Sequence, residues 1–256
     1  MEKISLSVAI ITQNEEENLR SCLQSIAFAR QIVVIDSGST DATLQIAAKF
    51  GCEIYNEVWH GFGPQKQMAI DKCREQWILV LDADERIPQE TADVVKKIVN
   101  TLKVKETGFS FPRKNYFQGR WIKHAGWWPD RITRLFRKEA GRMTSAAVHE
   151  AVVVEGLVGS LDVPIEHFTE SRLSKIMQKI DKYSTLGAQE AFQEGKQATT
   201  FSAFARAFLA FIQGYFVRLG FLDGMPGLTL AVTDAVNKFF KYAKLSELTR
   251  IYRAGK

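Results

Sequence analysis

Residues 78–85 read Ile-Leu-Val-Leu-Asp-Ala-Asp-Glu, an apolar run that ends in a cluster of acidic side chains. The run is typical of a strand buried on both faces of a parallel sheet. If the chain stays extended after it, the two-residue period of a strand puts the carboxylates of Asp82 and Asp84 on one side. Two such carboxylates repel each other unless a cation lies between them, and Mg²⁺ or Mn²⁺ takes oxygen ligands and shares substrate phosphates. The stretch therefore predicts a divalent metal site, and an acidic turn without a ligand is the simpler alternative.

Strand-like and helix-like segments alternate four times around this run. The predicted strands cover residues 6–12, 32–35, 52–55 and 78–82, and helical spacing follows each of them, over 16–28, 44–50, 65–73 and 88–102. This alternation predicts an α/β fold, a mostly parallel sheet with helices on both faces. Ligands of such sheets bind beyond the carboxyl ends of the strands, which is where Asp82 lies.

The pattern changes from residue 107 onwards. Short strand-like pieces predict a mixed or antiparallel extension of the sheet, with a hairpin turn at Gln118-Gly119. Residues 127–130, Trp-Trp-Pro-Asp, form an aromatic loop that is either packing for an irregular segment or a platform for a sugar ring. After His167 the chain is predicted to be helical to its end. We therefore expect two domains, an α/β domain over 1–170 and a helical extension over 171–256.

The charge and the cysteines limit the classes of protein to consider. The net charge is +5, and residues 201–256 alone hold 8 Lys/Arg against 3 Asp/Glu, so the excess belongs to the C-terminal segment. Cys22, Cys52 and Cys73 are odd in number and far apart, which argues against a disulfide framework and favours a reducing compartment. We expect no cleavable leader, and no spanning helix, because no uninterrupted run of about 18 apolar residues exists.

Two polar positions could meet a nucleotide. Asp36 follows the second predicted strand and precedes Ser-Gly-Ser, a turn that opens a helix. A carboxylate there can accept from an imide N–H or a ribose hydroxyl, and a plain capping turn is the alternative. Lys66 follows the Gly-rich loop at 61–64, where it either meets a diphosphate or is a solvated surface lysine. No G-x-G-x-x-G motif follows the first strand, which counts against NAD and FAD.

Two further positions could carry chemistry. His149-Glu150 lies among apolar residues, and a charged pair is costly to bury there without a purpose. Glu150 could serve as a general base, or it could be a structural partner of an arginine. His167 follows a short predicted strand at 162–165, and a lone histidine of this kind is more often structural than a metal ligand.

Taken together, these segments resemble the inverting glycosyltransferases of family 2, which have the GT-A fold. The matching segments are residues 12–19 (Thr-Gln-Asn-Glu-Glu-Glu-Asn-Leu), 36–41 (Asp-Ser-Gly-Ser-Thr-Asp) and 81–85 (Leu-Asp-Ala-Asp-Glu). Within that family the chain is similar to the lipopolysaccharide inner-core β-glucosyltransferases. The closer similarity comes from residues 62–67 (Phe-Gly-Pro-Gln-Lys-Gln), 128–130 (Trp-Pro-Asp), 134–136 (Arg-Leu-Phe), 148–150 (Val-His-Glu) and 220–224 (Gly-Phe-Leu-Asp-Gly).

The resemblance implies how a nucleotide-sugar donor would be held. Asp36 would bind the uracil and ribose side of the nucleotide, with Thr12 and Glu15 beside it. Asp82 would contact the ribose or the water shell of the metal, and Lys66 would face the diphosphate.

The same resemblance implies a metal, a base and a reaction. Asp84 would bind Mg²⁺ or Mn²⁺, with His167 as a candidate third ligand, and Glu150 would deprotonate the attacking hydroxyl. The implied reaction moves one glucose from UDP-glucose to a lipid-linked saccharide such as a lipopolysaccharide core heptose. The Gln-x-x-Arg-Trp motif of processive synthases is absent, which favours transfer of a single sugar. The alternatives are a polyprenyl phosphate acceptor, an aspartyl-nucleophile phosphatase and a non-enzymatic nucleotide-binding module.

The C-terminal segment predicts attachment to a membrane surface. Residues 201–222 are aromatic along one side and carry Arg206 and Arg218, which are too close together to flank a span. Further basic residues follow over 238–256. This pattern favours helices in the interface, with basic side chains at anionic headgroups, on the inner face of a bacterial cytoplasmic membrane. No nucleic acid partner is expected, and the alternative is that the aromatic stripe packs as ordinary core.

Overall fold

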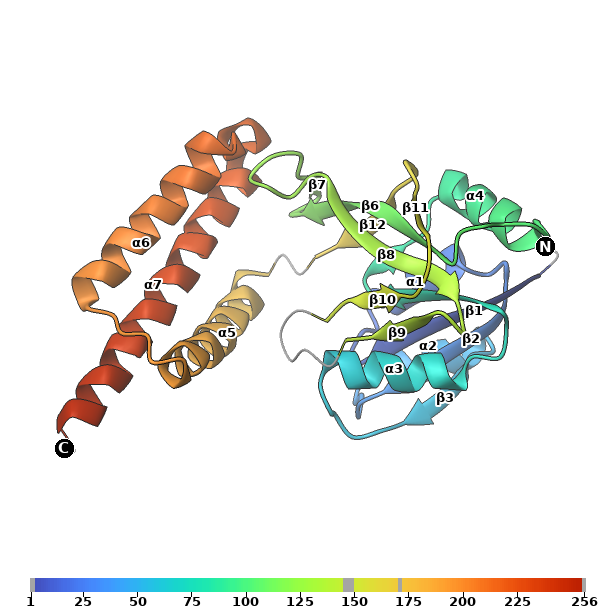
Figure 1. Cartoon of the computed structure of the whole chain (residues 1–256), viewed down its shortest axis with the longest axis horizontal. Coiled ribbons are helices and arrows are strands. Elements are labelled where there is room, and N and C mark those ends of the chain that lie inside the picture. Colours follow the sequence, from blue (N-terminus) through green and yellow to red (C-terminus); the bar gives the residue numbers. More distant parts are fainter. Residues whose placement is uncertain (1–2, 145–149, 170–171, 255–256) are drawn as a thin grey trace. The chain divides into compact units, whose positions relative to one another are not determined.

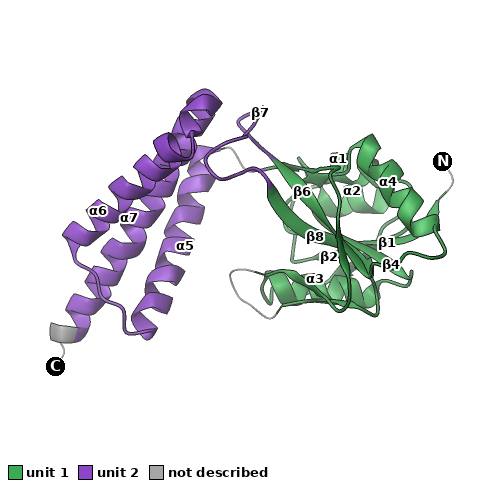
Figure 2. Cartoon of the chain, turned by 45° about the horizontal axis from the view of Figure 1, so that its top comes forward, with its two compact units in different colours: residues 1–114, 130–168 green, residues 115–129, 169–256 purple. Residues whose placement is uncertain are grey.

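The computed structural model describes residues 3–144, 150–169 and 172–254 of the chain, and Figure 1 gives its elements. The chain divides into two compact units, which Figure 2 distinguishes by colour. Unit 1 consists of Met1–Lys114 and Asp130–Phe168, and unit 2 of Asn115–Pro129 and Thr169–Lys256. Unit 2 therefore contains an internal segment of the chain as well as its C-terminal part.

Unit 1 is built on four parallel strands with helices on both faces, as the alternation predicted. The strands are β1 (Ile4–Thr12), β2 (Ala29–Asp36), β3 (Glu53–Asn56) and β4 (Trp77–Asp82), in the spatial order β3-β2-β1-β4. The helices are α1 (Leu19–Ser25), α2 (Thr43–Lys49), α3 (Phe62–Lys72) and α4 (Gln89–Asn100). Alternate residues of β1 enter two cores: Val8 and Ile10 belong to the core with α1, α2 and α4, whereas Ala9 belongs to the core with α3.

The rest of the sheet is mixed, in agreement with the change of pattern at residue 107. β8 (Asp130–Arg137) is antiparallel to β4, and β6 (Gly108–Phe117) is antiparallel to β8. The remaining strands are β5 (Glu85–Arg86), β11 (Val158–Ser160) and β12 (Ile165–Phe168) in the same sheet, and β9 (Gly141–Met143) with β10 (Val152–Val154) in a separate pair. The predicted hairpin is present, because β6 turns into β7 (Arg120–Trp121) through Gln118 and Gly119, whose φ angles are 49° and 75°.

The strand register brings three polar residues to one edge of the sheet. Thr12 pairs with Asp36, and β1 also pairs with β4 so that Asp82 ends at the same level. Beyond Asp82 the chain does not stay extended, because residues 83–84 form a turn and β5 follows at once. The expectation that the carboxylates of Asp82 and Asp84 share one side is therefore wrong: the two side chains have different partners, described below.

Unit 2 consists of three helices and a loop that packs on them. The helices are α5 (Leu173–Gln193), α6 (Thr200–Ile212) and α7 (Gly224–Ala254), and α6 continues into a π-helical turn over Gln213–Val217. Asp223, which is buried, accepts hydrogen bonds from the backbone N–H groups of Lys123 and His124. These bonds hold the loop of residues 120–129 against the start of α7.

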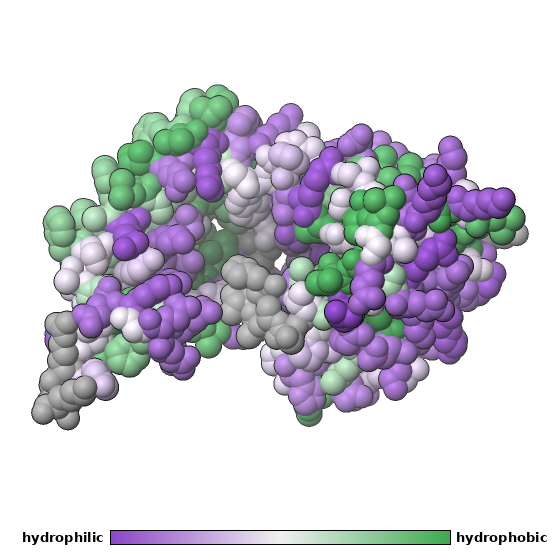
Figure 3. All heavy atoms as spheres, viewed as in Figure 1, coloured by the Kyte–Doolittle hydropathy of each residue, from purple (hydrophilic) through white to green (hydrophobic). Residues whose placement is uncertain are grey.

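Three aromatic side chains of α6, those of Phe201, Phe204 and Phe208, are exposed. Phe201 and Phe204 are 81% and 63% exposed, and Figure 3 shows hydrophobic residues gathered along this helix. In the described part of the chain, one helical segment, Thr200–Val217, is long and apolar enough to cross a membrane by length and composition alone. Its mean hydropathy is only 1.2, since Arg206 lies inside it. The sequence-based expectation of an interfacial helix stays a prediction.

Candidate active site

Asp36 organises the loop that follows β2. It is completely buried, and its two oxygens accept four hydrogen bonds from the chain itself. The donors are Thr12 Oγ1 (2.8 Å), the N–H groups of Gly38 (2.9 Å) and Ser39 (2.7 Å), and Ser39 Oγ (2.5 Å). Gly38 has a φ of 86°, a conformation that costs glycine least. The loop of residues 37–40 is therefore held in a fixed conformation by one carboxylate.

The segment after β1 is interlocked with this loop. Asn14, with a left-handed φ of 57°, accepts a hydrogen bond from the N–H of Thr40 (2.8 Å) and donates its own N–H to Ser39 Oγ (2.8 Å). The Glu15 carboxylate accepts from Asn18 Nδ2 (2.9 Å). The segments 12–19 and 36–41 thus form one wall at the carboxyl ends of β1 and β2, and Thr12, Glu15 and Asp36 all lie in it.

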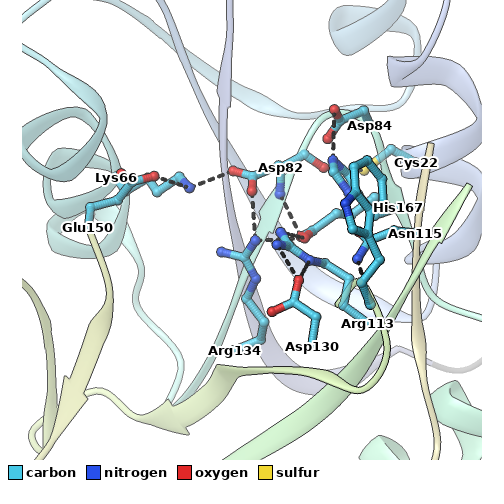
Figure 4. A network of polar contacts seen from close by, with 12 residues as sticks. Cys22, Lys66, Asp82, Asp84, Arg113, Asn115, Asp130, Arg134, Glu150 and His167 are labelled. Atoms are coloured by element: carbon cyan, nitrogen blue, oxygen red, sulfur yellow. Dashed lines mark hydrogen bonds and ion pairs between the residues drawn. The ribbon is translucent and has the colours of Figure 1, made fainter. Parts of the chain in front are cut away.

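Asp82 lies between two buried cations, as Figure 4 shows. Its Oδ1 is 2.6 Å from Lys66 Nζ, and its Oδ2 is 2.6 Å from Arg134 Nη2. The side chains of Lys66 and Arg134 are only 5% and 8% exposed, whereas that of Asp82 is 27% exposed. Burial would raise the pKa of Asp82, but the charges of Lys66 and Arg134 outweigh it and hold that pKa well below its usual range. Asp82 is therefore a carboxylate at neutral pH.

Glu85, which has no exposed surface, completes the network around Arg134. Its Oε1 is 2.6 Å from Arg134 Nη2 and 3.5 Å from Arg113 Nη1, and its Oε2 accepts from the N–H of Asp82 (3.0 Å). Arg113 also contacts Asp130 at 2.6 Å. Burial would lower the pKa of Arg134, but Glu85 and Asp82 raise it, so the guanidinium keeps its charge.

Glu150 is brought to the same cluster through Lys66. Its Oε1 is 3.3 Å from Lys66 Nζ, and its side chain is 18% exposed. The structural alternative for Glu150 was an arginine partner, but the partner in the structure is Lys66. A Cβ on Gly63 would lie 2.6 Å from the carbonyl oxygen of Thr144, so only glycine at position 63 lets Thr144 approach α3 this closely. His149, the other member of the predicted pair, lies outside the described residues.

Asp84 points away from this cluster and toward His167 (Figure 4). Its Oδ2 is 3.3 Å from His167 Nε2, and both side chains are partly exposed. Burial would lower the pKa of His167, but the hydrogen bond to Asp84 and the negative charges of Asp84 and Glu85 raise that pKa. Within the described residues no group of three or more His, Cys, Asp or Glu side chains could hold a metal. One carboxylate and one imidazole nevertheless suit Mg²⁺ or Mn²⁺, because such ions usually keep waters and take phosphate oxygens from a substrate.

Sequence reasoning did not single out Arg134, Glu85 or Arg113 as site residues. Arg134 appeared only inside the motif at 134–136, and Glu85 only at the end of the acidic run. The available signal for these residues was the group of polar side chains along 130–134, directly before the apolar pair Leu135-Phe136. Their use required knowing that β8 pairs with β4, which a single sequence does not give.

The comparisons with known proteins show the family to which the chain belongs. Residues 7–155 match the family model described as Glycosyl transferase family 2, and the chain belongs to this family of glycosyltransferases. The predicted GT-A fold, with its mostly parallel sheet, helices on both faces and C-terminal helical extension, is confirmed.

Two related sequences and one solved structure show how similar the chain is to individual proteins. The chain is 31% identical to the lipopolysaccharide core biosynthesis glycosyltransferase LpsC of Rhizobium meliloti (strain 1021), over 95% of this chain and 92% of that protein. It is 26% identical to an uncharacterised glycosyltransferase of Rickettsia prowazekii (strain Madrid E), over 95% and 87%. A solved glucosyl-3-phosphoglycerate synthase from Mycobacterium tuberculosis, in complex with Mn²⁺, uridine-diphosphate and phosphoglyceric acid, gives a TM-score of 0.47 at 16% identity, covering 68% of this chain and 73% of that one.

Proposed function

We propose that this glycosyltransferase moves one glucose from UDP-glucose to a lipopolysaccharide core heptose or a similar lipid-linked acceptor, with inversion at the anomeric carbon. The observation that carries the chemistry is the Lys66 ammonium, which lies between Asp82 at 2.6 Å and Glu150 at 3.3 Å. Lys66 thereby links Asp82, at the carboxyl end of β4, to Glu150, whose carboxylate is partly exposed to solvent. The name of the relative LpsC supports the choice of acceptor class.

The wall formed by residues 12–19 and 36–41 is our proposed site for the nucleoside. Asp36 is saturated by donors of the chain itself, so we infer that it acts mainly by shaping the loop of residues 37–40. A direct contact of Asp36 with uracil or ribose requires one of those donors to move. Thr12 donates a hydrogen bond to Asp36, and Glu15 belongs to the same wall.

The diphosphate is the next group to be placed. Lys66 and Arg134 are buried cations beside Asp82, and both can form charge-assisted hydrogen bonds with phosphate oxygens. Asp84 and His167 would hold a divalent ion, which would supply positive charge to the leaving diphosphate. Asp82 would then contact the ribose or the water around that ion.

Glu150 is our proposed general base. An acceptor hydroxyl gives its proton to the Glu150 carboxylate while its oxygen forms a bond to the anomeric carbon. The bond from that carbon to the phosphate oxygen breaks on the opposite side, so an α-linked donor yields a β-linkage. Lys66 now pairs with Glu150, and a diphosphate bound beside Lys66 would compete for that ammonium and leave Glu150 with a weaker partner.

We also propose that the segment 171–256 attaches the enzyme to the inner face of a bacterial cytoplasmic membrane, where a lipid-linked acceptor would be met. The support is the exposure of Phe201, Phe204 and Phe208, at 81%, 63% and 57%, together with the basic residues of α7. Aromatic rings beside basic side chains suit the interface of an anionic membrane.

The test has two stages. First, a panel of nucleotide-sugars is screened for protection against thermal unfolding, and UDP-glucose should protect most, by about 2.7 kcal/mol at a hundred times its Kd. Second, transfer of radiolabelled glucose is measured to heptose-containing lipopolysaccharide core and to polyprenyl phosphate. Protection by UDP-glucose with transfer only to polyprenyl phosphate would replace our acceptor. No protection by any nucleotide-sugar would contradict the proposed donor class.

A further inference from the structure

Unit 2 contains a cavity of about 460 Å³, and none of the residues assigned above to the donor, the metal or the base lines it. Its walls come from α5, α6 with the π-helical turn, α7, and the loop of residues 125–127. The side chains that bear on its chemistry are Trp127, Lys179, Tyr183, Arg218, Asp234 and Asn237. A volume of this size is within the range of sites for small ligands, which are mostly apolar with a few placed polar groups.

Asn237 presents an unused acceptor to this cavity. Its Oδ1 is buried and has no hydrogen-bond partner among the described residues. A buried amide oxygen without a donor costs about 1–3 kcal/mol, so native structures seldom leave one unless a ligand or water supplies the donor. The wall is therefore prepared for a hydroxyl or N–H group from a bound molecule. The carboxylate of Asp234, three residues earlier on the same helix, is a second acceptor for hydroxyl donors.

The cavity also carries positive charge. Lys179 and Arg218 line it, and neither forms an ion pair within residues 3–144, 150–169 and 172–254. The Arg218 guanidinium lies over Gly126, where an added Cβ would come within 2.8 Å of Nη1. Cations without a carboxylate partner at a cavity wall suit an anionic group of a ligand.

Irregular backbone positions these groups. The π-helical turn over Gln213–Val217 brings Gln213 and Gly214 to the cavity, and such turns within helices occur frequently at functional sites. The carbonyl of Arg218 accepts from the N–H of Ala125 (2.8 Å), which fixes the loop that carries Trp127. The hydrogen bonds from the neighbouring Lys123 and His124 to Asp223 hold the same part of the loop.

We propose that this cavity is a binding site for an anionic saccharide, a sugar that carries a phosphate or carboxylate group. The ring lies against Trp127, the hydroxyls donate to Asn237 and Asp234, and Lys179 with Arg218 binds the anionic group. The site does not depend on the proposed donor or base residues, since none of them belongs to unit 2. It gives the helical unit a recognition function in addition to attachment.

Direct binding measurements on the full chain test this site. Glucose 6-phosphate, glucuronate, glucose and inorganic phosphate are titrated separately by isothermal titration calorimetry, with EDTA and without nucleotide. Arg218→Gln should weaken binding of the two anionic sugars about fivefold or more, because a charge-assisted hydrogen bond is lost. Arg250→Gln, which removes an exposed cation of α7 outside the cavity, is the matched control and should leave binding unchanged.

A second variant keeps the result interpretable. Asn237→Leu removes an acceptor that has no partner among the described residues, so it should keep or raise the melting temperature while weakening sugar binding. Glucose and inorganic phosphate should each bind more weakly than the anionic sugars. Unchanged binding in both cavity variants, or no binding of any anionic sugar to the natural sequence, would overturn the proposal. If inorganic phosphate binds as strongly as glucose 6-phosphate, the cavity binds anions without recognising the sugar ring, and the proposal of a saccharide site is refuted.

Discussion

Replacing Glu150 by glutamine separates its proposed role as a base from its contact with Lys66. Glutamine has nearly the same shape, and its Oε1 can still accept a hydrogen bond from Lys66 Nζ, 3.3 Å away. The amide cannot take a proton from an acceptor hydroxyl. Lys66 also keeps its shorter contact with Asp82, at 2.6 Å, so no buried cation is left without a partner.

The expected magnitudes of the two effects differ. Loss of a general base lowers kcat by about 10²-fold or more, which is about 2.7 kcal/mol or more of transition-state stabilisation. Loss of charge on a carboxylate that is 18% exposed, 3.3 Å from an ammonium that keeps another partner, costs about 1 kcal/mol of folding stability. In a chain of 256 residues such a change lowers the melting temperature by about 2–4 °C.

The assay measures kcat and the Kd of UDP-glucose for Glu150→Gln beside Glu155→Gln. Glu155 is a matched control because its carboxylate is 71% exposed and pairs with the exposed Arg142. We expect the Kd of the donor to stay constant in both variants and kcat to fall only in Glu150→Gln. A kcat within about threefold of the natural enzyme would refute the base assignment, because a base contributes far more than that.

Three other perturbations follow from the same structure. Asp84→Ala should abolish transfer with the melting temperature nearly unchanged, as a chelator should in the natural enzyme, and turnover by this variant in chelator would disprove the metal requirement. Arg134→Gln should lower the free energy of unfolding by about 3 kcal/mol at pH 7, because two carboxylates then lose their buried partner. The folded protein holds the pKa of Asp82 low, so the contribution of the Asp82–Arg134 pair to stability is complete above about pH 4 and is lost as the pH falls further. Urea unfolding at lower pH should therefore show a smaller difference in the free energy of unfolding between the variant and the natural protein. Phe201→Ser with Phe208→Ser should reduce flotation with anionic liposomes, and binding that is unchanged, or equal with neutral liposomes at high salt, would contradict interfacial attachment.

Local patterns were enough to predict the sheet and the hairpin. The parallel strands were predictable because each apolar run is followed by helical spacing, and the hairpin turn was predictable because Gly119 suits the positive φ that such a turn requires. The positions of Asp36 and Asp82 at one edge followed from the same rule, since parallel strands end together.

Pairings between distant parts of the chain were not predictable. The predicted direction of the Asp84 side chain was wrong because the chain turns after Asp82, where the prediction assumed an extended strand. Glu85 accepts a hydrogen bond from the N–H of Asp82, and β5 pairs with β12. The contact of Arg134 with Asp82 depends on the register of β8 beside β4. Neither the register nor the proximity of Glu150 to Lys66 leaves a trace in local composition.

The segment Asn115–Pro129 has a consequence for how the enzyme is made and how it can be cut. It belongs to the helical unit, yet the ribosome releases it before α5, α6 and α7 exist. Until the start of α7 has been synthesised, Asp223, which directly precedes that helix, cannot accept from the N–H groups of Lys123 and His124. The helical unit therefore cannot mature as an appendage added to a finished catalytic module. A chain shortened to end at residue 169 would keep this segment without its helices, and a graft of the helices onto another catalytic module would have to carry residues 115–129 with it.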